Sequence, residues 1–218
     1  MSEETRGGHV RIAVIEPGKE PYTALVKTDE EGWCDEALSE LVGGDTEYYY
    51  LLFGEEPALV YNDSMIDENL PPNRVVFAKE WMVDAGYMSL RDCNRTVFGD
   101  PKWVPGCLLP SPKRVLFEGE VHIVLQGTFL AVSHGEDGRP RDITDEELER
   151  VAVEFGGPDL NSGREAVAAI REDRIEEFEE EHRSRRLCAG LDDLERDCGL
   201  ASGPTPSLSR LLREAAER

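Results

Sequence analysis

The feature that most constrains the fold is a five-residue connection, PGKEP at positions 17–21, between two strand-like runs. The run HVRIAVIE before it alternates and is rich in β-branched residues, and YTALVK after it resumes strand character. Pro17-Gly18 is a strong turn signal, and Pro21 prevents a helix from beginning at that point. We therefore predict that a β-hairpin opens the folded part of the chain.

The lysine beside this glycine raises the question whether the turn also binds a phosphate group. A phosphate-binding loop needs a glycine-rich run followed by Lys-Ser or Lys-Thr at the start of a helix. Here Lys19 is followed by Glu20 and Pro21, and no glycine-rich run surrounds it. We interpret Lys19 as an exposed turn residue and the connection as a purely structural one.

Short strand-like and helix-like runs continue along the chain. Strands are indicated by DTEYYYLLFG, PALVYND and NRVVF, and RVLFEGEVHIVLQGTFLAVSH supplies one or two more, the second apolar enough to be central. The run CDEALSELVGG is helical and ends at Gly43-Gly44, and ITDEELERVAVEFGG begins with a capping box formed by Thr144 and Glu147. We predict an α+β domain over residues 1–160, with a mixed or antiparallel sheet and flanking helices.

Two segments depart from this pattern. Residues 78–114 contain two of the three tryptophans, two cysteines and four prolines, and we interpret them as an insertion in which KEWMVDAGYMSL is a short helix. Residues 161–218 are predicted to form a helical C-terminal extension that begins with one long helix over 161–186, capped by Ser162 with Glu165. The apolar stripe of this helix is thin, so it also suits partner docking or a homodimer through the C-terminal helices.

The charge balance excludes several classes of partner. The chain carries 46 acidic and 24 basic residues, a formal net charge of −22 at pH 7. Such a field repels nucleic acids and anionic membranes, and it attracts basic surfaces over a Debye length of about 10 Å. No apolar run approaches the roughly 20 residues of a membrane helix, and MSEETRGGH resembles no targeting peptide. We therefore expect a cytoplasmic protein that binds neither nucleic acid directly nor membranes.

The residues that usually carry chemistry form no recognisable constellation. The five cysteines contain no C-x-x-C pair and lie near no histidine at ligand spacing, which favours buried thiols over a zinc site. His122 and His134 flank the run IVLQGTF and are interpreted as structural. Since no nucleophile and base occur in a known arrangement, we predict no catalytic residue, no metal and no cofactor, and hence a protein that is not an enzyme.

Six separated motifs occur in a fixed order: VIEPGKEPYTALV, LSELVGGDTEYYYLL, PALVYND, NLPPNRVV, QGTFLAVS and ITDEELERVAVEFG. Together they resemble the family known as domain of unknown function 3846, over roughly residues 10–156 and interrupted by 78–114. This family occurs chiefly on phages, plasmids and integrative elements, so the resemblance implies a mobile-element context. The family has no established catalytic mechanism, and the resemblance therefore carries over no catalytic residue.

Three polar residues at positions that match the family's motifs lie beside apolar strands: Asn73, Arg74 and Thr128. They are candidates for a functional role. We favour the structural interpretation, in which their hydrogen bonds tie a loop to the sheet, because most buried polar groups are satisfied within the fold.

The charge and the mobile-element context together indicate an anti-defence protein. Its target would be a host complex with a basic nucleic-acid channel, such as a CRISPR effector or a restriction enzyme. As a DNA mimic it would imitate a duplex that carries about one charge per 1.7 Å, which requires many carboxylates on one face. The candidate contact residues are acidic or aromatic: Glu30, Glu31, Asp35, Glu36, Glu40, Asp45, Glu47, Asp145, Glu146, Glu149, Glu176, Glu177, Glu180, Trp81 and Trp103.

Two other functions fit the same sequence. The chain is also consistent with a small-molecule or nucleotide-binding accessory protein, against which the negative field and the missing phosphate loop argue. It is consistent as well with an acidic interaction module adapted to high salt, because net charge alone speaks to solubility and association rather than to a partner. Stability in dilute buffer distinguishes the salt-adapted module from the inhibitor.

Overall fold

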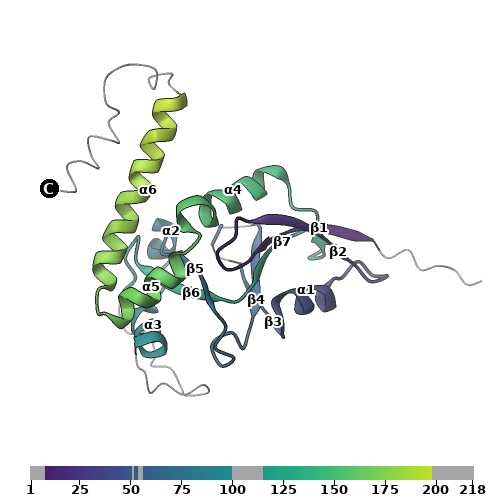
Figure 1. Ribbon diagram of the computed structural model, residues 1–218. Coiled ribbons are helices and arrows are strands. Elements are labelled where there is room, and N and C mark those ends of the chain that lie inside the picture. The colour runs from purple at the N-terminus through teal and green to yellow at the C-terminus, as the bar shows by residue number, and fades with distance from the viewer. Residues whose placement is uncertain (1–7, 51, 54–55, 100–114, 198–218) are drawn as a thin grey trace, which may run out of the picture. The chain divides into compact units, whose positions relative to one another are not determined.

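The computed structural model describes residues 8–50, 52–53, 56–99 and 115–197, which divide into two compact units (Figure 1). Unit 1 extends to Asp173 and contains every described strand, and unit 2 begins at Arg174 and contains helix α6, Ile175–Asp197. The antiparallel sheets of unit 1 together with its helices confirm the predicted α+β class.

A six-stranded antiparallel sheet is the framework of unit 1. Its strands follow the order β2-β1-β7-β4-β3, with β8 paired to β7. The strands are β1 His9–Ile15, β2 Tyr22–Lys27, β3 Thr46–Tyr49, β4 Ala58–Asn62, β7 Phe129–His134 and β8 Pro140–Arg141. The strongly apolar β7 lies between β1 and β4, so the predicted central position of this strand is confirmed.

The helical segments of unit 1 are short. They are α1 Asp35–Val42, α2 Glu80–Asp84, α3 Arg91–Asn94, α4 Asp145–Phe155 and α5 Ser162–Arg171, with a π-turn segment η1 Arg95–Gly99 and a 3-10 turn η2 Gly157–Asp159. No helix in the described part of the chain is both long enough and apolar enough to cross a membrane.

The connection between β1 and β2 turns the chain as predicted. The two strands pair in antiparallel register with Val14 opposite Tyr22. Inside the turn, the Lys19 N–H donates to the Glu16 carbonyl at 3.2 Å, and Gly18 adopts the positive φ of 72° that favours glycine. The Tyr22 hydroxyl closes the hairpin by donating to the Glu16 carboxylate at 2.7 Å. The predicted hairpin is thus confirmed.

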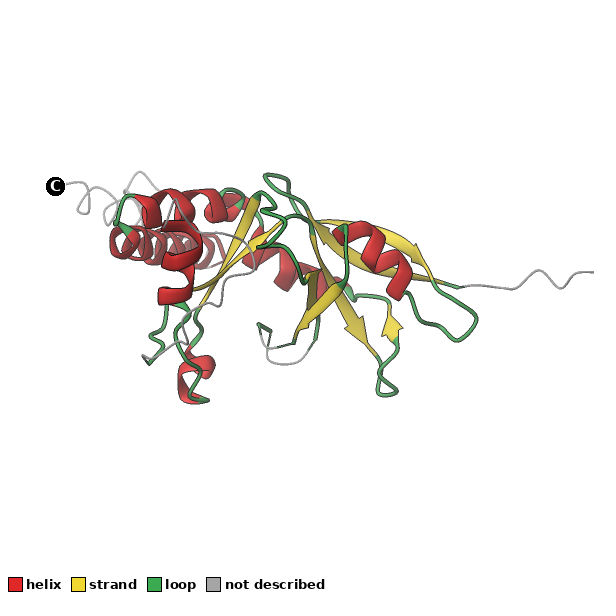
Figure 2. Ribbon diagram, turned by 90° about the horizontal axis from the view of Figure 1, so that it is seen from below, coloured by secondary structure: helices red, strands yellow, loops and turns green. Residues whose placement is uncertain are grey.

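The pleat of the large sheet assigns the two main helices to opposite faces. Ile12 and Val14 of β1 belong to the apolar cluster that contains Leu38 of α1. Ala13 and Ile15 point to the other face and belong to the cluster that contains Phe155 of α4. Figure 1 shows α1 and α4 on opposite sides of β1 and β7, and Figure 2, seen from the α1 side, shows α1 lying across the strands.

A separate two-stranded sheet consists of β5, Pro72–Phe77, and β6, Val121–Gln126, and α5 packs against it. The Val75 N–H donates to the Ser162 hydroxyl at 3.1 Å. Beside it, a Cβ placed on Gly163 would lie only 2.7 Å from the carbonyl carbon of Asn73. The Ser-Gly pair at the start of α5 therefore permits direct contact between the helix and the strand backbone.

The capping box predicted for the helix that follows Ile143 is present in α4. The Glu147 N–H donates to the Thr144 hydroxyl at 3.2 Å, and the Thr144 N–H donates to the Glu147 carboxylate at 2.8 Å. The N–H groups at the start of a helix have no backbone acceptor within the helix, so these two side chains supply the missing hydrogen bonds.

The prediction of one long helix over 161–186 is wrong. The chain forms α5 and α6 instead, because Asp173 adopts φ 57° between them, a left-handed conformation incompatible with continuing the helix. Ser162 is not the N-cap of α5, since its hydroxyl binds Val75, and Asn161 occupies the cap position. The division between the units accordingly follows Asp173 rather than residue 160.

Part of the predicted insertion is described. Residues 78–99 form α2, α3 and η1, whereas residues 100–114 lie outside the described residues, as does Trp103. The predicted short helix is present as α2. Within it, Trp81 is half-buried and packs edge to face against Tyr87, with ring centroids 5.8 Å apart. The indole of Trp81 therefore supports the local packing around α2.

Candidate functional site: an acidic surface at helix α1

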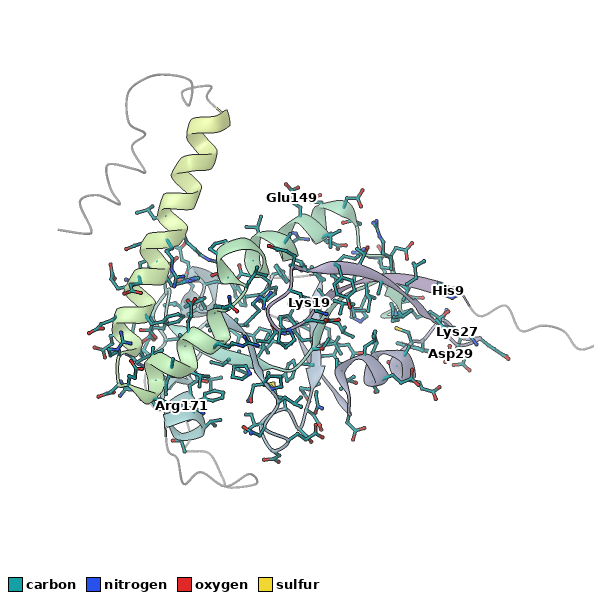
Figure 3. All side chains as sticks on the ribbon, in the orientation of Figure 1. His9, Lys19, Lys27, Asp29, Glu149 and Arg171 are labelled. Atoms are coloured by element: carbon teal, nitrogen blue, oxygen red, sulfur yellow. The ribbon has the colours of Figure 1, made fainter. Side chains whose placement is uncertain are left out.

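All thirteen predicted acidic contact residues are exposed, but they occupy separate parts of the molecule. Those near α1 and those on α4 lie on opposite faces of the six-stranded sheet, and Figure 3 shows Asp29 on the α1 side with Glu149 on α4. Glu176, Glu177 and Glu180 belong to α6 in unit 2. The carboxylates of unit 1 therefore do not form the one-faced array that DNA mimicry across the whole domain requires.

The pleat also separates Glu47 from the residues of α1. Tyr48 packs with the apolar cluster under α1. Because neighbouring residues of a strand point to opposite faces, Glu47 points away from α1, and Tyr61 lies directly opposite it on β4. Asp45 precedes β3 and lies beyond the end of α1.

Six exposed carboxylates remain at α1 and in the loop before it. We name the following set the α1 acidic surface: Asp29, Glu30, Glu31, Asp35, Glu36 and Glu40. Asp29 was not among the predicted contact residues. Its role depends on the conformation of the loop, which the sequence did not reveal.

Asp29 holds this loop in a fixed shape. One oxygen of its carboxylate accepts hydrogen bonds from the Glu31 N–H at 2.9 Å and the Trp33 N–H at 2.8 Å. Its own N–H donates to the Trp33 carbonyl at 2.7 Å, and Gly32 supplies a positive φ of 92°. The loop thereby fixes the backbone position of Trp33 next to the start of α1.

A cavity of about 470 Å³ opens between the end of β2 and the start of α1. Four carboxylate residues of the α1 acidic surface line it: Asp29, Asp35, Glu36 and Glu40. Trp33, with 36% of its surface exposed, forms an aromatic wall, and the hydroxyl-bearing Thr28 and the basic Lys27 complete this part of the lining. Figure 3 shows Lys27 and Asp29 close together at this end of unit 1.

Two other groups at this site remain protonated at neutral pH. Burial, followed by the charges of Asp35 and Asp29, raises the pKa of the Cys34 thiol to about 11. Burial also raises the pKa of the Tyr48 hydroxyl, which the neighbouring Asp35 raises further. A protonated thiol is a poor nucleophile. The site is thus suited to binding a cation through its carboxylates rather than to covalent chemistry at Cys34.

An aromatic cluster borders the site on the β3 side. Tyr48 and Tyr50 stack with centroids 5.7 Å apart, and the His134 ring lies 6.0 Å from Tyr48 and 6.1 Å from Tyr50. His134 Nδ1 lies 3.2 Å from a Glu56 carboxylate oxygen. The run of three tyrosines at 48–50 was the sequence signal for this cluster, but it indicated only a strand.

Asn73 and Arg74 connect three parts of unit 1. The Asn73 amide donates to the carbonyls of Ile15 at 2.9 Å and Gly127 at 2.7 Å. The fully buried Arg74 guanidinium donates to three further backbone carbonyls: Phe155 at 2.8 Å, Leu160 at 2.7 Å and Lys19 at 2.6 Å. These bonds agree with the structural interpretation of both residues.

Arg74 also connects the hairpin turn to β5, through its hydrogen bond to the Lys19 carbonyl. Its burial lowers the pKa of the guanidinium, and the nearby charges of Glu20 and Asp159 oppose that change. The arginine stays protonated because its ordinary pKa lies so far above neutral. Thr128, the third polar motif residue, is half-buried between β6 and β7 and is not part of this network of hydrogen bonds.

The described residues contain no group of three histidine, cysteine, aspartate or glutamate side chains placed to hold one metal ion.

Residues 10–90 match the family described as Domain of unknown function (DUF3846). The match confirms the resemblance over this segment of the chain. It runs through residues 78–90 and ends before β6, so the motifs QGTFLAVS and ITDEELERVAVEFG lie beyond it. No curated protein and no solved structure gives a significant match to the chain.

Proposed function

We propose that this protein is an acidic inhibitor that binds a basic protein surface through the α1 acidic surface. The partner would be a nucleic-acid-handling host complex, such as a CRISPR effector or a restriction enzyme, and the protein would act in the cytoplasm for a mobile genetic element. The net charge of −22 and the family resemblance support this proposal. Nucleic-acid mimicry, in this form, is limited to a local patch.

The observation that carries the proposal is that none of the six side chains of the α1 acidic surface has an ion-pair partner among the described residues. By contrast, Asp145 of α4 pairs with Arg11 at 2.9 Å. Like charges held close together repel one another, so a cationic partner gains attraction and also relieves repulsion.

Two charge-matched variants test which face binds. Glu36→Gln with Glu40→Gln removes two negative charges from the α1 acidic surface. Glu146→Gln with Glu149→Gln removes two from exposed positions of α4, on the opposite face of the sheet. The tagged wild-type protein and both variants are used to capture partners from a host lysate at about 50 mM and about 500 mM salt, and mass spectrometry quantifies the retained proteins.

The proposal predicts a basic nucleic-acid-handling protein that is retained at low salt and released at high salt. The α4 variant should retain it like the wild type, whereas the α1 variant should bind it about tenfold more weakly, because each lost pair contributes up to about 1 kcal/mol. Loss of the partner from the α4 variant with retention by the α1 variant would contradict the proposal. Capture of no such protein would exclude the inhibitor function in that host.

A further inference from the structure

We infer that the cavity beside α1 receives the guanidinium group of an arginine side chain from the basic partner, an inference that rests on the proposed function. Three features of the cavity support this ligand: its charge, its aromatic wall and the hydroxyl of Thr28.

The charge of the cavity favours a cation. Four carboxylate residues line it against one lysine, Lys27. A second basic residue, Arg139, lies near the loop, since its Cδ is 3.6 Å from the Cβ position of Gly32. The Arg139 guanidinium is directed to Asp137, at 3.7 Å. The carboxylates that line the cavity thus outnumber the nearby basic groups of this chain, and a cation from a partner is electrostatically complementary.

Trp33 distinguishes arginine from lysine. A planar guanidinium stacks on an indole and forms bidentate hydrogen bonds with carboxylates, whereas an ammonium is a compact and strongly hydrated point charge. Trp33 borders the same cavity as these carboxylates, and the hydrogen bonds of Asp29 fix its backbone. The loop is therefore organised before the partner arrives, which lowers the entropy lost on binding.

Thr28 supplies the third feature. The residue as a whole is 92% buried and lines the cavity, but its hydroxyl oxygen is not among the fully buried polar atoms of the described residues. The hydroxyl is therefore accessible and can accept a hydrogen bond from a donor that enters the cavity. A guanidinium carries five N–H donors, more than one carboxylate accepts, so it can use the hydroxyl as well. The cavity volume of about 470 Å³ also lies within the usual range of ligand pockets.

The test uses two blocked tetrapeptides of equal charge, one of arginine and one of lysine. Isothermal titration calorimetry at low salt measures their affinities for the full chain and for Trp33→Leu, with Trp81→Phe as the control because Trp81 lies outside the cavity. We expect the wild type and Trp81→Phe to bind the arginine peptide about two- to fivefold more tightly than the lysine peptide. Trp33→Leu should lose this preference while still binding both peptides.

A second variant tests the contribution of the Thr28 hydroxyl. Thr28→Val keeps the shape of the side chain and removes the hydroxyl, and we expect it to weaken the arginine peptide by about threefold. Circular dichroism checks that each variant is folded. Retention of the arginine preference by Trp33→Leu, or equal binding of both peptides by the wild type, would overturn the inference and leave the proposed function standing. Failure of both peptides to bind at low salt would contradict the proposed function itself.

Discussion

Helices α1 and α4 begin with similar sequences but use their acidic residues in opposite ways. The first turn of α1 contains Asp35 and Glu36, and that of α4 contains Asp145, Glu146 and Glu147. Acidic residues at both positions interact favourably with the helix dipole. The chain around α4 supplies internal partners to two of them, Asp145 and Glu147, whereas the chain around α1 leaves its pair exposed and without ion pairs among the described residues.

The internal partners in α4 converge on Glu147. Its carboxylate accepts hydrogen bonds from Ser133 at 3.0 Å, from the Arg141 guanidinium at 2.6 and 3.0 Å, and from the Thr144 N–H at 2.8 Å. In α1, Cys34 occupies the N-cap and makes no side-chain capping hydrogen bond. A carboxylate with internal partners therefore stabilises the fold, whereas exposed carboxylates without ion pairs stay available to the partner that we propose.

Removing the internal carboxylate should have the largest effect. Glu147→Ala removes the ion-pair partner of Arg141 and the acceptor of the Thr144 N–H, and we expect a loss of about 3 kcal/mol in the free energy of unfolding. Glu36→Ala, the matched change in α1, should alter it by less than about 0.5 kcal/mol. Urea denaturation of both variants measures the difference. Equal losses would contradict the contrast between the two helices.

The pH dependence of stability should show the same contrast. Burial opposes ionisation of Glu147, but the bonds from Arg141, Thr144 and Ser133 lower its pKa to about 2 from 4.5. Because the folded-state pKa lies below the unfolded-state value, its contribution is complete above pH 4.5 and is lost as the pH falls to about 2. We expect a loss on the order of 2 kcal/mol in this window, measured by urea denaturation at several pH values. Glu147→Gln should remove this part of the pH dependence. An unchanged profile would show that the loss of stability in this pH range does not come from Glu147.

A buried histidine, His122, should make stability depend on pH in a second, higher pH range. Burial lowers the pKa of His122 to about 4 from 6.5, so protonation favours the unfolded state. Its contribution to stability is complete above pH 6.5 and decreases as the pH falls to about 4. In His122→Gln the stability between these pH values should be nearly constant, as measured by the same denaturation series. A variant that retains the wild-type slope would show that another group titrates there.

The cap of α4 should contribute less than its carboxylate. Thr144→Ala removes the hydroxyl that accepts from the Glu147 N–H, and we expect a loss of about 1 kcal/mol. Thr144→Ser keeps the hydroxyl and should stay within about 0.5 kcal/mol of the wild type. Thermal denaturation compares the two variants, and a loss of the same size in Thr144→Ser would point to packing of the methyl group instead.

The smallest effect should come from the α1 acidic surface itself. Glu36→Gln with Glu40→Gln relieves repulsion between exposed charges, so it should stabilise the protein by a few tenths of a kcal/mol at low salt and by less at high salt. The wild type should remain folded in dilute buffer. If circular dichroism shows that the wild type unfolds in dilute buffer, the alternative of an acidic module adapted to high salt would be favoured instead.

Local sequence signals predicted those parts of the fold that depend on neighbouring residues. Pro17-Gly18 indicated the hairpin, and the Thr144 and Glu147 pair indicated the start of α4. The break at Asp173 was not predicted, because the helical pattern continues on both sides of a residue whose conformation the surrounding structure selects. The role of Ser162 was also predicted wrongly, because it depends on a distant strand. The Ser162 hydroxyl accepts a hydrogen bond from the Val75 N–H of β5 instead of capping the helix.

The candidate site was predicted only in part. The sequence identified exposed acidic residues, but it did not show that α1 and α4 lie on opposite faces, which the pleat of β1 decides. It also missed Asp29 and Trp33, because their placement depends on hydrogen bonds within the loop before α1. Residue type predicted which groups are charged, and long-range pairing decided which of them lie together.

The most direct test of the central claim is an NMR titration of the full chain with a short arginine-rich peptide at low salt. Binding through the α1 acidic surface predicts that the largest amide shift changes occur between Asp29 and Glu40, with little change in α4 or α6. Changes concentrated in α4 or α6, with those of the α1 acidic surface no larger than the average, would contradict the claim.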